Sequence, residues 1–326
     1  MYAITGVTGK VGGAAARALL DAGHAVRAVL RDKKKAAEWV ERGAEVAIAS
    51  FEDADALAAA FSGTAGVFVM VAPNFAPQPG YPNARAAVAA LKEALVTARP
   101  QRVAALSSIG GQRESGLGLI TQVHILEEAL ADLQIPTAIL RPAWFMENSL
   151  WDIVPARETG VMSSFLQPLD RAYPMIATAD IGRVIAETLT QSWQGRRVIE
   201  IEGPQRYTQN EIAAMLGGVL GRSVMAQAVP HDQWEALFQS QGTAWPVPRI
   251  EMIDGFNSGW IDFEDGVHER VIGSTGYQTV LAELISKDFP GLRIVTVWCD
   301  HGWCNATFHK GGSHGQDYSC WRGSGE

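Results

Sequence analysis

Short apolar runs alternate with amphipathic stretches over the first 142 residues of the chain. The apolar runs are rich in Val, Ile and Ala, and they predict buried strands at Tyr2–Ile4, Ala25–Leu30, Glu45–Ala49, Val67–Val71, Arg102–Leu106 and Thr137–Leu140. The stretches between them predict helices at Val11–Ala22, Lys33–Arg42, Asp55–Phe61, Asn83–Ala98 and Thr121–Leu133. Strands that alternate with helices predict a mainly parallel sheet covered on both faces, which is a doubly wound α/β fold.

The pattern loosens after Pro142, where aromatic residues, glycine and proline interrupt the periodicity. Four later elements are still predicted: a helix at Asp180–Ser192, a strand at Arg197–Glu202, a capped helix at Thr208–Leu220 and a helix within Pro230–Gly242. We therefore expect a cofactor-binding domain of residues 1–142, to which residues 177–203 return, and a smaller C-terminal substrate lobe of residues 143–176 and 204–286.

Residues 287–326 differ from the rest of the chain, because they hold all three cysteines and have almost no helical or strand periodicity. Their cysteines and histidines invite a zinc interpretation, but the spacing matches no usual ligand set, so no metal is predicted at Cys299, His301, Cys304, His309, His314 and Cys320. An atypical, disordered tail is the prediction. A shifted reading frame after Ile285 is an alternative origin for this composition.

Charge and composition narrow the class of protein. The formal net charge is −8, and no long basic stripe gathers Lys and Arg on one face, so nucleic acid is not an expected ligand. No apolar run approaches the roughly 20 residues that a membrane-spanning helix needs, and no secretory signal is recognisable. The absence of cysteine before residue 299 favours a reducing, cytoplasmic location. Oligomerisation is left open.

The strongest motif is the glycine-rich segment Thr5–Gly12, which follows a predicted strand and opens a predicted helix. Glycines there permit a tight turn and let the backbone approach a pyrophosphate, while the amides of the helix N-terminus point at its charge. This context predicts a Rossmann-type dinucleotide site in which these residues bind the cofactor: Gly6, Thr8, Gly9, Lys10, Val11 and Gly12.

Arg31 stands at the end of the second predicted strand, where an NAD-binding site usually has an acidic residue for the ribose hydroxyls. A guanidinium at this place can hold a 2′-phosphate instead. The lysines that follow, including Lys35, are unfavourable at a helix N-terminus unless an anion lies nearby. The prediction is NADP(H), although Asp32 could serve NAD if the register slipped by one residue.

Two further strand ends should face the same crevice. Val71, Ala72 and Pro73 end the fourth strand, and Ser107 ends the fifth. We expect them near the ribose or the nicotinamide. Ordinary loop chemistry at the end of a strand is the alternative for each.

The glycine turn resembles that of the NmrA-like branch of atypical short-chain dehydrogenases when it is taken together with two later segments. These are Ile135–Asn148, which ends Arg-Pro-x-x-Phe-x-Glu-Asn, and Ala179–Gly182. That branch includes flavin-free, NADPH-using reductases of quinones, azo compounds and triphenylmethane dyes, and also redox sensors that bind the dinucleotide without turnover. The resemblance implies that Val71–Pro73 and Ala143, Trp144 and Phe145 lie along the nicotinamide half of the cofactor.

The Tyr-x-x-x-Lys dyad of carbonyl-reducing short-chain dehydrogenases and sugar epimerases is absent, because no tyrosine has a lysine four residues on. By the resemblance, His124 lies near a polar position that faces the nicotinamide, and we predict it as the acid that protonates a reduced substrate; a histidine without chemical role is the alternative. Glu127 and Glu128 are expected to be solvated helix charges.

Two functions are therefore open. The first is an NADPH-dependent reductase that passes hydride directly to an electron-poor small molecule. An aromatic acceptor is the prediction, because these aromatic residues could line its pocket: Trp144, Phe145, Trp151, Phe165 and Trp245. Core packing is the alternative role for each. The second function is a non-catalytic NADP sensor that acts through a protein partner.

Overall fold

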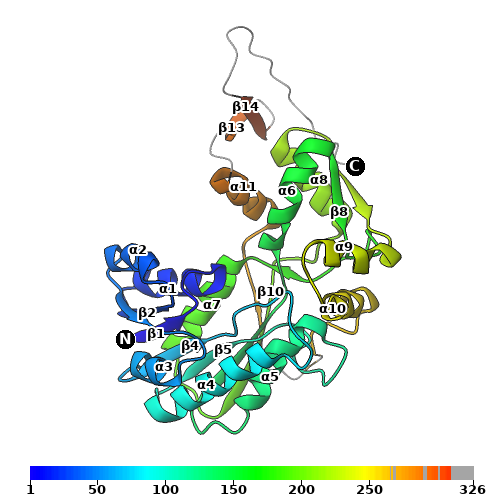
Figure 1. Cartoon of the computed structure of the whole chain (residues 1–326). Coiled ribbons are helices and arrows are strands. Elements are labelled where there is room, and N and C mark those ends of the chain that lie inside the picture. Colours follow the sequence, from blue (N-terminus) through cyan, green and yellow to red (C-terminus); the bar gives the residue numbers. More distant parts are fainter. Residues whose placement is uncertain (265, 267–268, 289–291, 300–301, 310–326) are drawn as a thin grey trace. The chain divides into compact units, whose positions relative to one another are not determined.

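The computed structural model describes residues 1–264, 266, 269–288, 292–299 and 302–309, with only the backbone from residue 288 on (Figure 1). Backbone proximity divides the chain into two units: residues 1–145, 174–205 and 230–274 form the first, and residues 146–173, 206–229 and those from 275 on form the second. Residues 230–274, which the sequence pattern grouped with the substrate lobe, lie in the first unit because a strand within them joins its sheet.

The first unit is built on an eight-stranded sheet in the order β12-β10-β6-β5-β4-β1-β2-β3, and every neighbouring pair is parallel. The strands are β1 Tyr2–Thr5, β2 Val26–Leu30, β3 Glu45–Ile48, β4 Gly66–Val69, β5 Val103–Leu106, β6 Thr137–Pro142, β10 Arg196–Glu202 and β12 Glu269–Ile272. The chain runs outward from β1 to β3 and then returns to β4 on the other side of β1. The predicted doubly wound Rossmann-type fold is confirmed, and its topological switch point lies between β1 and β4.

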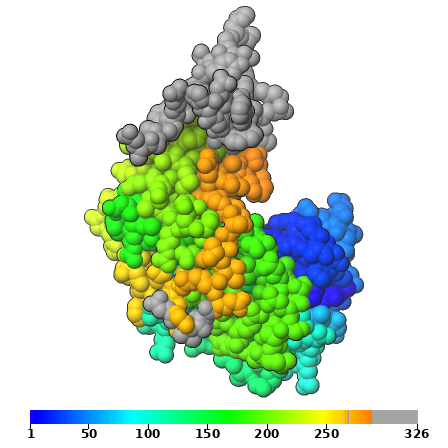
Figure 2. Space-filling view, turned by 180° about the vertical axis from the view of Figure 1, so that it is seen from behind, coloured from blue at the N-terminus to red at the C-terminus, as the bar shows by residue number. Residues whose placement is uncertain are grey.

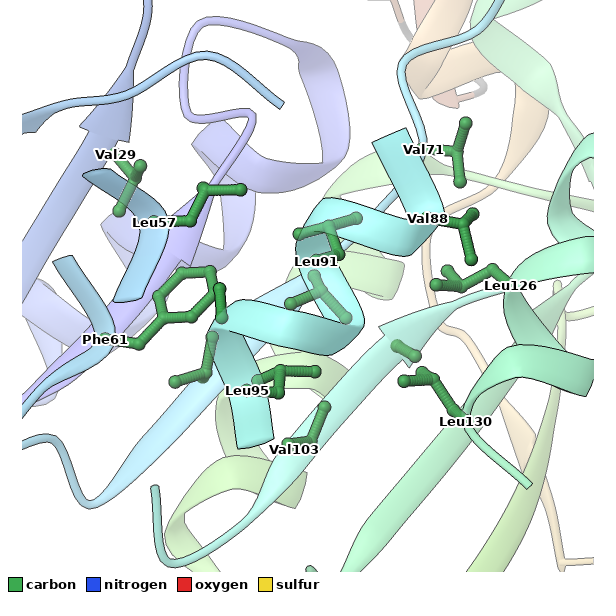
Figure 3. Close-up of a cluster of buried hydrophobic side chains, with 14 of the residues drawn as sticks. Val29, Leu57, Phe61, Val71, Val88, Leu91, Leu95, Val103, Leu126 and Leu130 are labelled. Atoms are coloured by element: carbon green, nitrogen blue, oxygen red, sulfur yellow. The ribbon is translucent and has the colours of Figure 1, made fainter. Parts of the chain in front are cut away.

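One face of the sheet is covered by α3 (Ala54–Phe61), α4 (Pro82–Ala98) and α5 (Thr121–Ala129). Their apolar side chains, such as Phe61, Leu91 and Leu126, pack with alternate strand residues into one buried cluster (Figure 3). In β4, Val67 and Val69 belong to this cluster while Phe68 does not, as the two-residue period of a strand requires.

The other face carries α1 (Lys10–Asp21) and α7 (Thr178–Thr190), which lie side by side (Figure 1). A Cβ atom at Gly182 of α7 would come within 2.4 Å of the Cβ of Ala14 in α1, so only glycine allows the two helices to approach this closely. This contact explains the glycine of the segment Ala179–Gly182 in terms of packing.

The other helices of the first unit are α2 (Ala36–Glu41), α9 (Trp234–Ser240) and α10 (Val247–Ser258), and the short strands β7 (Trp144–Phe145) and β9 (Met175–Ile176) pair in parallel. The predicted helix Lys33–Arg42 is divided into a 3₁₀ turn at Lys33–Lys35, followed by α2. The sequence pattern missed α10, whose second residue is Pro248, and the edge strand β12.

The second unit contains α6 (Leu150–Thr159), α8 (Gln209–Leu220) and α11 (Tyr277–Asp288), with β8 (Val161–Ser164) and β11 (Met225–Ala228) paired in parallel. Figure 2 shows α11, in orange, against the green surface of the same unit. The capping box predicted at Thr208 is confirmed, because its hydroxyl accepts from the Glu211 amide and the Glu211 carboxylate accepts from the Thr208 amide. The pattern missed α6, which has Pro155 in its interior.

Strands β13 (Leu292–Cys299) and β14 (Gly302–His309) pair antiparallel within the segment predicted as a tail. His301, His314 and Cys320 lie outside the described residues, and only the backbone of Cys299, Cys304 and His309 is described. Among the described residues, no three His, Cys, Asp or Glu side chains gather as metal ligands would. No helix among the residues that the structure describes is long and apolar enough to cross a membrane.

Candidate functional site

The predicted cofactor residues follow the carboxyl ends of five adjacent strands, β6-β5-β4-β1-β2. Because parallel strands end at the same edge of a sheet, this edge receives all five segments. These are Gly6–Gly12 after β1, Arg31 after β2, Val71–Pro73 after β4, Ser107 after β5 and Ala143–Phe145 after β6.

The glycine turn opens α1 without a capping side chain. The Gly9 amide donates to the Gly6 carbonyl at 2.9 Å and closes the turn between β1 and α1. No side chain caps α1 at Gly9, and its first turn holds no acidic residue. The positive end of the helix dipole is therefore suited to an anion.

Two glycines of this turn are required by space. A Cβ atom at Gly12 would lie 2.5 Å from the carbonyl oxygens of both Thr5 and Gly6. Gly6 has a φ of +64°, and a Cβ there would lie 2.6 Å from the sulfur of Met70. A larger residue at either place would push the turn open, so this backbone is a cradle that a Cβ would fill.

The other residues of the turn differ in what they can offer to a ligand. Thr8 and Lys10 are exposed, so their side chains can reach a phosphate. The Val11 side chain is only 5% exposed and belongs to the core. Val11 can therefore bind a ligand only through its backbone.

Arg31 and Asp32, the two candidates for selecting the nucleotide, have different surroundings. The Asp32 carboxylate accepts from the Lys34 amide at 2.9 Å and caps the 3₁₀ turn that begins at Lys33. Arg31 is exposed, and it has no ion-pair partner within the described residues. Lys35 is likewise exposed and without an ion-pair partner among them. Asp32 therefore has a structural role, while Arg31 and Lys35 leave cationic groups available.

The loop after β4 begins in the core and emerges from it. Val71 is 7% exposed and packs in the buried cluster, while Pro73 is exposed. Ala72 lies between them and is partly exposed. The Gln122 amide of α5 donates to the carbonyl of Asn74 at 2.9 Å and fixes this loop against the helix.

Glu127 is not the solvated helix charge expected from the sequence. Its side chain is 5% exposed, and its carboxylate accepts from Arg141 at 2.9 Å and 2.7 Å in a bidentate ion pair. Arg196 donates to it at 3.2 Å, and the Ser107 hydroxyl donates at 2.5 Å. The prediction that Glu127 lies on a helix is confirmed, but α5 directs its carboxylate toward Arg141 of β6 and not toward solvent. The expectation of a solvated charge holds for Glu128, which is 66% exposed.

Burial alone would raise the pKa of Glu127, but the hydrogen bond and the charge of Arg141 outweigh it, so the pKa lies below its ordinary value. The same pairing holds the pKa of Arg141 above its usual range despite burial. An arginine at the end of an apolar strand signals a buried acidic partner, but it does not say which one. Ser107, predicted beside the cofactor, is 4% exposed, and its hydroxyl is committed to Glu127.

His124 lies on α5, beside the loop that follows β5. Its Nδ1 is 2.9 Å from the carbonyl oxygen of Gly111, which can only accept, so Nδ1 carries a proton. Its Nε2 is 3.5 Å from the carboxylate of Glu128, and the imidazole is 16% exposed. In the neutral ring Nε2 is therefore the free acceptor, and in the charged ring it becomes a second donor.

The segment after β6 is held by backbone pairing. Ala143 is 2% exposed, and its amide donates to the carbonyl of Ile201 at 2.9 Å. Trp144 and Phe145 form β7 and are partly exposed, and the Trp144 ring meets Phe256 of α10 edge-on at 5.1 Å. Trp144 therefore has a packing role at this place, whatever else it touches.

Tyr81 does not substitute for the tyrosine of the missing Tyr-x-x-x-Lys dyad. The nearest approximation, Tyr81 with Arg85, is directed elsewhere: the Tyr81 hydroxyl donates to the Gly118 carbonyl at 2.9 Å, and Arg85 donates to Gly80. Burial raises the pKa of Tyr81, whereas a tyrosine acting as the acid of that dyad needs a lowered one.

The second unit contains a polar cluster that the sequence did not reveal. The Ser149 hydroxyl lies 2.7 Å from that of Tyr277, and both side chains are buried. Burial raises the pKa of Asp152 to about 7, although a hydrogen bond with Ser149 opposes the rise. Spacing alone could not find it, because Tyr277 stands far along the chain from the other two.

Comparison with known proteins places this architecture among reductases. The profile of the NmrA-like family matches residues 2–253. An NAD(P)H azoreductase of Xenophilus azovorans is 27% identical over 243 residues, which are 74% of this chain and 82% of that protein. Quinone oxidoreductase 2 of Escherichia coli (strain K12) is 27% identical over 295 residues, which are 89% of this chain and 99% of that protein.

The fold is also similar to a solved structure, the NADPH-dependent quinone oxidoreductase of Escherichia coli complexed with NADPH. The TM-score is 0.70 at 24% identity, over 89% of this chain and 100% of that one. At this level of identity the likeness establishes the fold. The role of each residue at the sheet edge stays a prediction.

Proposed function

Since this chain belongs to the NmrA-like family, we propose that it reduces an electron-poor small molecule, such as a quinone or an azo compound, with NADPH and without a flavin. The reductase class and the use of NADP(H) agree with the names of its relatives, an NAD(P)H azoreductase and a quinone oxidoreductase. Those names favour a reductase over the alternative of a sensor without turnover.

The observation that carries the proposal is the pairing of an uncapped glycine turn with an available guanidinium. The amides at the start of α1 would bind the pyrophosphate, because the glycines at 6 and 12 keep the cradle free of side-chain atoms. Arg31 would bind the 2′-phosphate, since Asp32 is engaged as a cap and Arg31 has no ion-pair partner within the described residues. These residues fit NADPH better than NADH.

The remaining predicted residues would position the reacting end. Bound NADPH supplies a hydride, so the protein need not provide the reductant. The loops after β4 and β6 are proposed to line the nicotinamide half through Val71–Pro73 and Ala143–Phe145. His124 is the proposed proton donor: its Nδ1–H is held by Gly111, so the proton of the charged ring that can be released lies on Nε2.

The test follows NADPH oxidation optically with a panel of quinones and azo compounds, using protein freed of flavin. We expect turnover with at least one acceptor, and no stimulation by added flavin. Background rates with every acceptor, despite bound NADPH, would contradict the reductase and favour a sensor.

Cofactor choice is tested separately with Arg31→Ala. Loss of a charge-assisted contact should raise the KM for NADPH by about 10- to 100-fold and leave the KM for NADH nearly unchanged. Arg42→Ala is the matched control, because Arg42 is also an exposed arginine of this region but pairs with Glu38 at 3.5 Å. Equal effects of the two variants on NADPH would refute the assignment of Arg31.

A further inference from the structure

We propose that Ser107, Glu127 and Arg141 form a positioning unit that fixes the orientation and the tautomer of His124 through the backbone of Gly111. The inference rests on the proposed function for its consequence in catalysis. Its structural part concerns only how the imidazole is held. All five residues belong to the first unit.

The base of the positioning unit is the buried ion pair. Arg141 and Glu127 are 6% and 5% exposed, and their two hydrogen bonds form the planar, bidentate arrangement of a guanidinium and a carboxylate. Burying two charges costs about as much as their attraction returns, so such a pair adds little net stability. What it does provide is a fixed geometry, because a movement of either partner would leave a buried charge without its bidentate partner.

Ser107 extends this rigid pair to the end of β5. Its hydroxyl donates to Oε1 of Glu127 at 2.5 Å, so the carboxylate on α5 holds the first residue after the strand. The turn that follows is closed by the Gly111 amide, which donates to the Ser108 carbonyl at 2.9 Å. The loop after β5 is therefore anchored to the ion pair at Ser107 and forms a tight turn between Ser108 and Gly111.

Gly111 is the link between the ion pair and the imidazole. A Cβ atom at this position would lie 2.6 Å from Oε1 of Glu127 and 2.7 Å from the hydroxyl oxygen of Ser107. The backbone of Gly111 thus packs directly against those two side chains, with no room for a larger residue. The carbonyl of the same glycine accepts from His124 Nδ1 at 2.9 Å.

The consequence for His124 is chemical. A carbonyl oxygen cannot donate, so as long as Gly111 stays in place the proton of the neutral ring resides on Nδ1. Nε2 is then left to exchange a proton with a reduced acceptor, and Glu128 is the carboxylate that faces it, at 3.5 Å. If the loop shifted, the ring could turn or adopt the other tautomer, and Nε2 would no longer be the exchanging nitrogen.

The experiment reads the tautomer directly, by proton–nitrogen correlation NMR of the imidazole side chains in the full-length protein, with His124→Gln assigning the signals. Ser107→Ala removes the link but keeps the ion pair, and Glu127→Gln weakens the ion pair itself. Asp132→Asn is the control, because it removes an exposed carboxylate just after the same helix, and that carboxylate pairs with Lys92 rather than with the positioning unit or His124. Rates are measured with the acceptor found above, as kcat and KM.

We expect wild type and Asp132→Asn to hold the Nδ1–H tautomer, and Ser107→Ala to lose it in part. In Ser107→Ala, kcat should fall on the order of tenfold, the lower end of the range for a hydrogen bond to a charged group, while the KM for NADPH stays nearly unchanged. If Glu127→Gln fails to fold, the tautomer of His124 in Ser107→Ala alone decides whether the positioning unit exists.

Two results separate the positioning unit from the proposed function. An unchanged tautomer in Ser107→Ala and Glu127→Gln would overturn the positioning unit, whatever the rates. A full kcat in His124→Gln would overturn the role of His124 as proton donor, while a tautomer shift in Ser107→Ala would still support the positioning unit.

Discussion

Two buried or partly buried carboxylates, one in each unit, respond to their surroundings in opposite ways. Glu127 in the first unit has a pKa below its ordinary value, whereas burial raises the pKa of Asp152 in the second unit to about 7. Burial acts to raise both pKa values, so burial alone cannot explain the difference. The difference is the guanidinium of Arg141, which lies 2.7 Å from Glu127, while Asp152 is met by the hydroxyl of Ser149.

The comparison separates a fixed charge from a titratable one. A full positive charge with two hydrogen bonds overcomes the cost of desolvation, and a single neutral donor does not. Glu127 therefore stays ionised as part of a rigid structure, whereas Asp152 changes its protonation near neutral pH. Tyr277 remains neutral in this cluster, because burial raises its pKa as well.

The largest effect should come from removing the charge that sustains Glu127. Arg141→Met leaves a carboxylate buried without its main partner, and we expect a loss of about 3–5 kcal/mol in the free energy of unfolding. Urea denaturation measures it. The matched control Arg42→Met removes an exposed ion pair and should cost less than about 1 kcal/mol. Similar losses in both variants would mean that the buried Glu127–Arg141 pair matters no more for stability than an exposed ion pair.

The next effect concerns Asp152 and the pH dependence of stability. Its folded pKa of about 7 exceeds the ordinary value of 3.8, so the folded state holds the proton more tightly than the unfolded chain. Stability from this group therefore falls as the pH rises from about 4 to about 7. Asp152→Asn should remove that fall and be more stable than wild type above pH 7, by on the order of 4 kcal/mol.

Urea denaturation at a series of pH values tests this, with Asp132→Asn as the control. Asp132 is an exposed aspartate whose pKa is lowered by Lys92, so its replacement should leave the slope between pH 4 and 7 as in wild type. A wild-type slope in Asp152→Asn would show that Asp152 is not the group responsible.

A smaller effect should follow from Ser149→Ala. The hydrogen bond of Ser149 lowers the pKa of Asp152, so its removal should move that pKa above about 7. The buried Tyr277 hydroxyl also loses its partner, at a cost of about 1–2 kcal/mol. Carbon NMR of the Asp152 carboxyl follows the titration, and an unchanged or lower pKa would contradict the assigned contact.

The smallest effect is expected for Glu264→Gln. Glu264 lies 3.4 Å from Arg141, but its side chain is 40% exposed, so solvent screens the pair. The variant should change the free energy of unfolding by less than about 1 kcal/mol, as measured in urea. A loss as large as that of Arg141→Met would show that the guanidinium depends on both carboxylates equally.

Much of the first unit could be predicted from the sequence because its signals are local. The apolar runs of β1 to β6 and the glycine turn between β1 and α1 each follow from neighbouring residues. Other elements gave no such signal. Pro155 interrupts the pattern of α6, and β12 is a short, exposed edge strand whose pairing with β10 cannot be inferred from periodicity.

The sequence by itself determined the class of fold, the glycine turn between β1 and α1 and the family resemblance, because turn geometry and the alternation of strands with helices depend on residues close together in the chain. Only the tertiary structure decided which charges are buried and with whom. Glu127 meets Arg141 and Ser107, and Ser149 meets Tyr277, across separations that no local pattern encodes. These contacts decide the pKa of each carboxylate, because the pKa depends on the charges and hydrogen-bond donors packed against it.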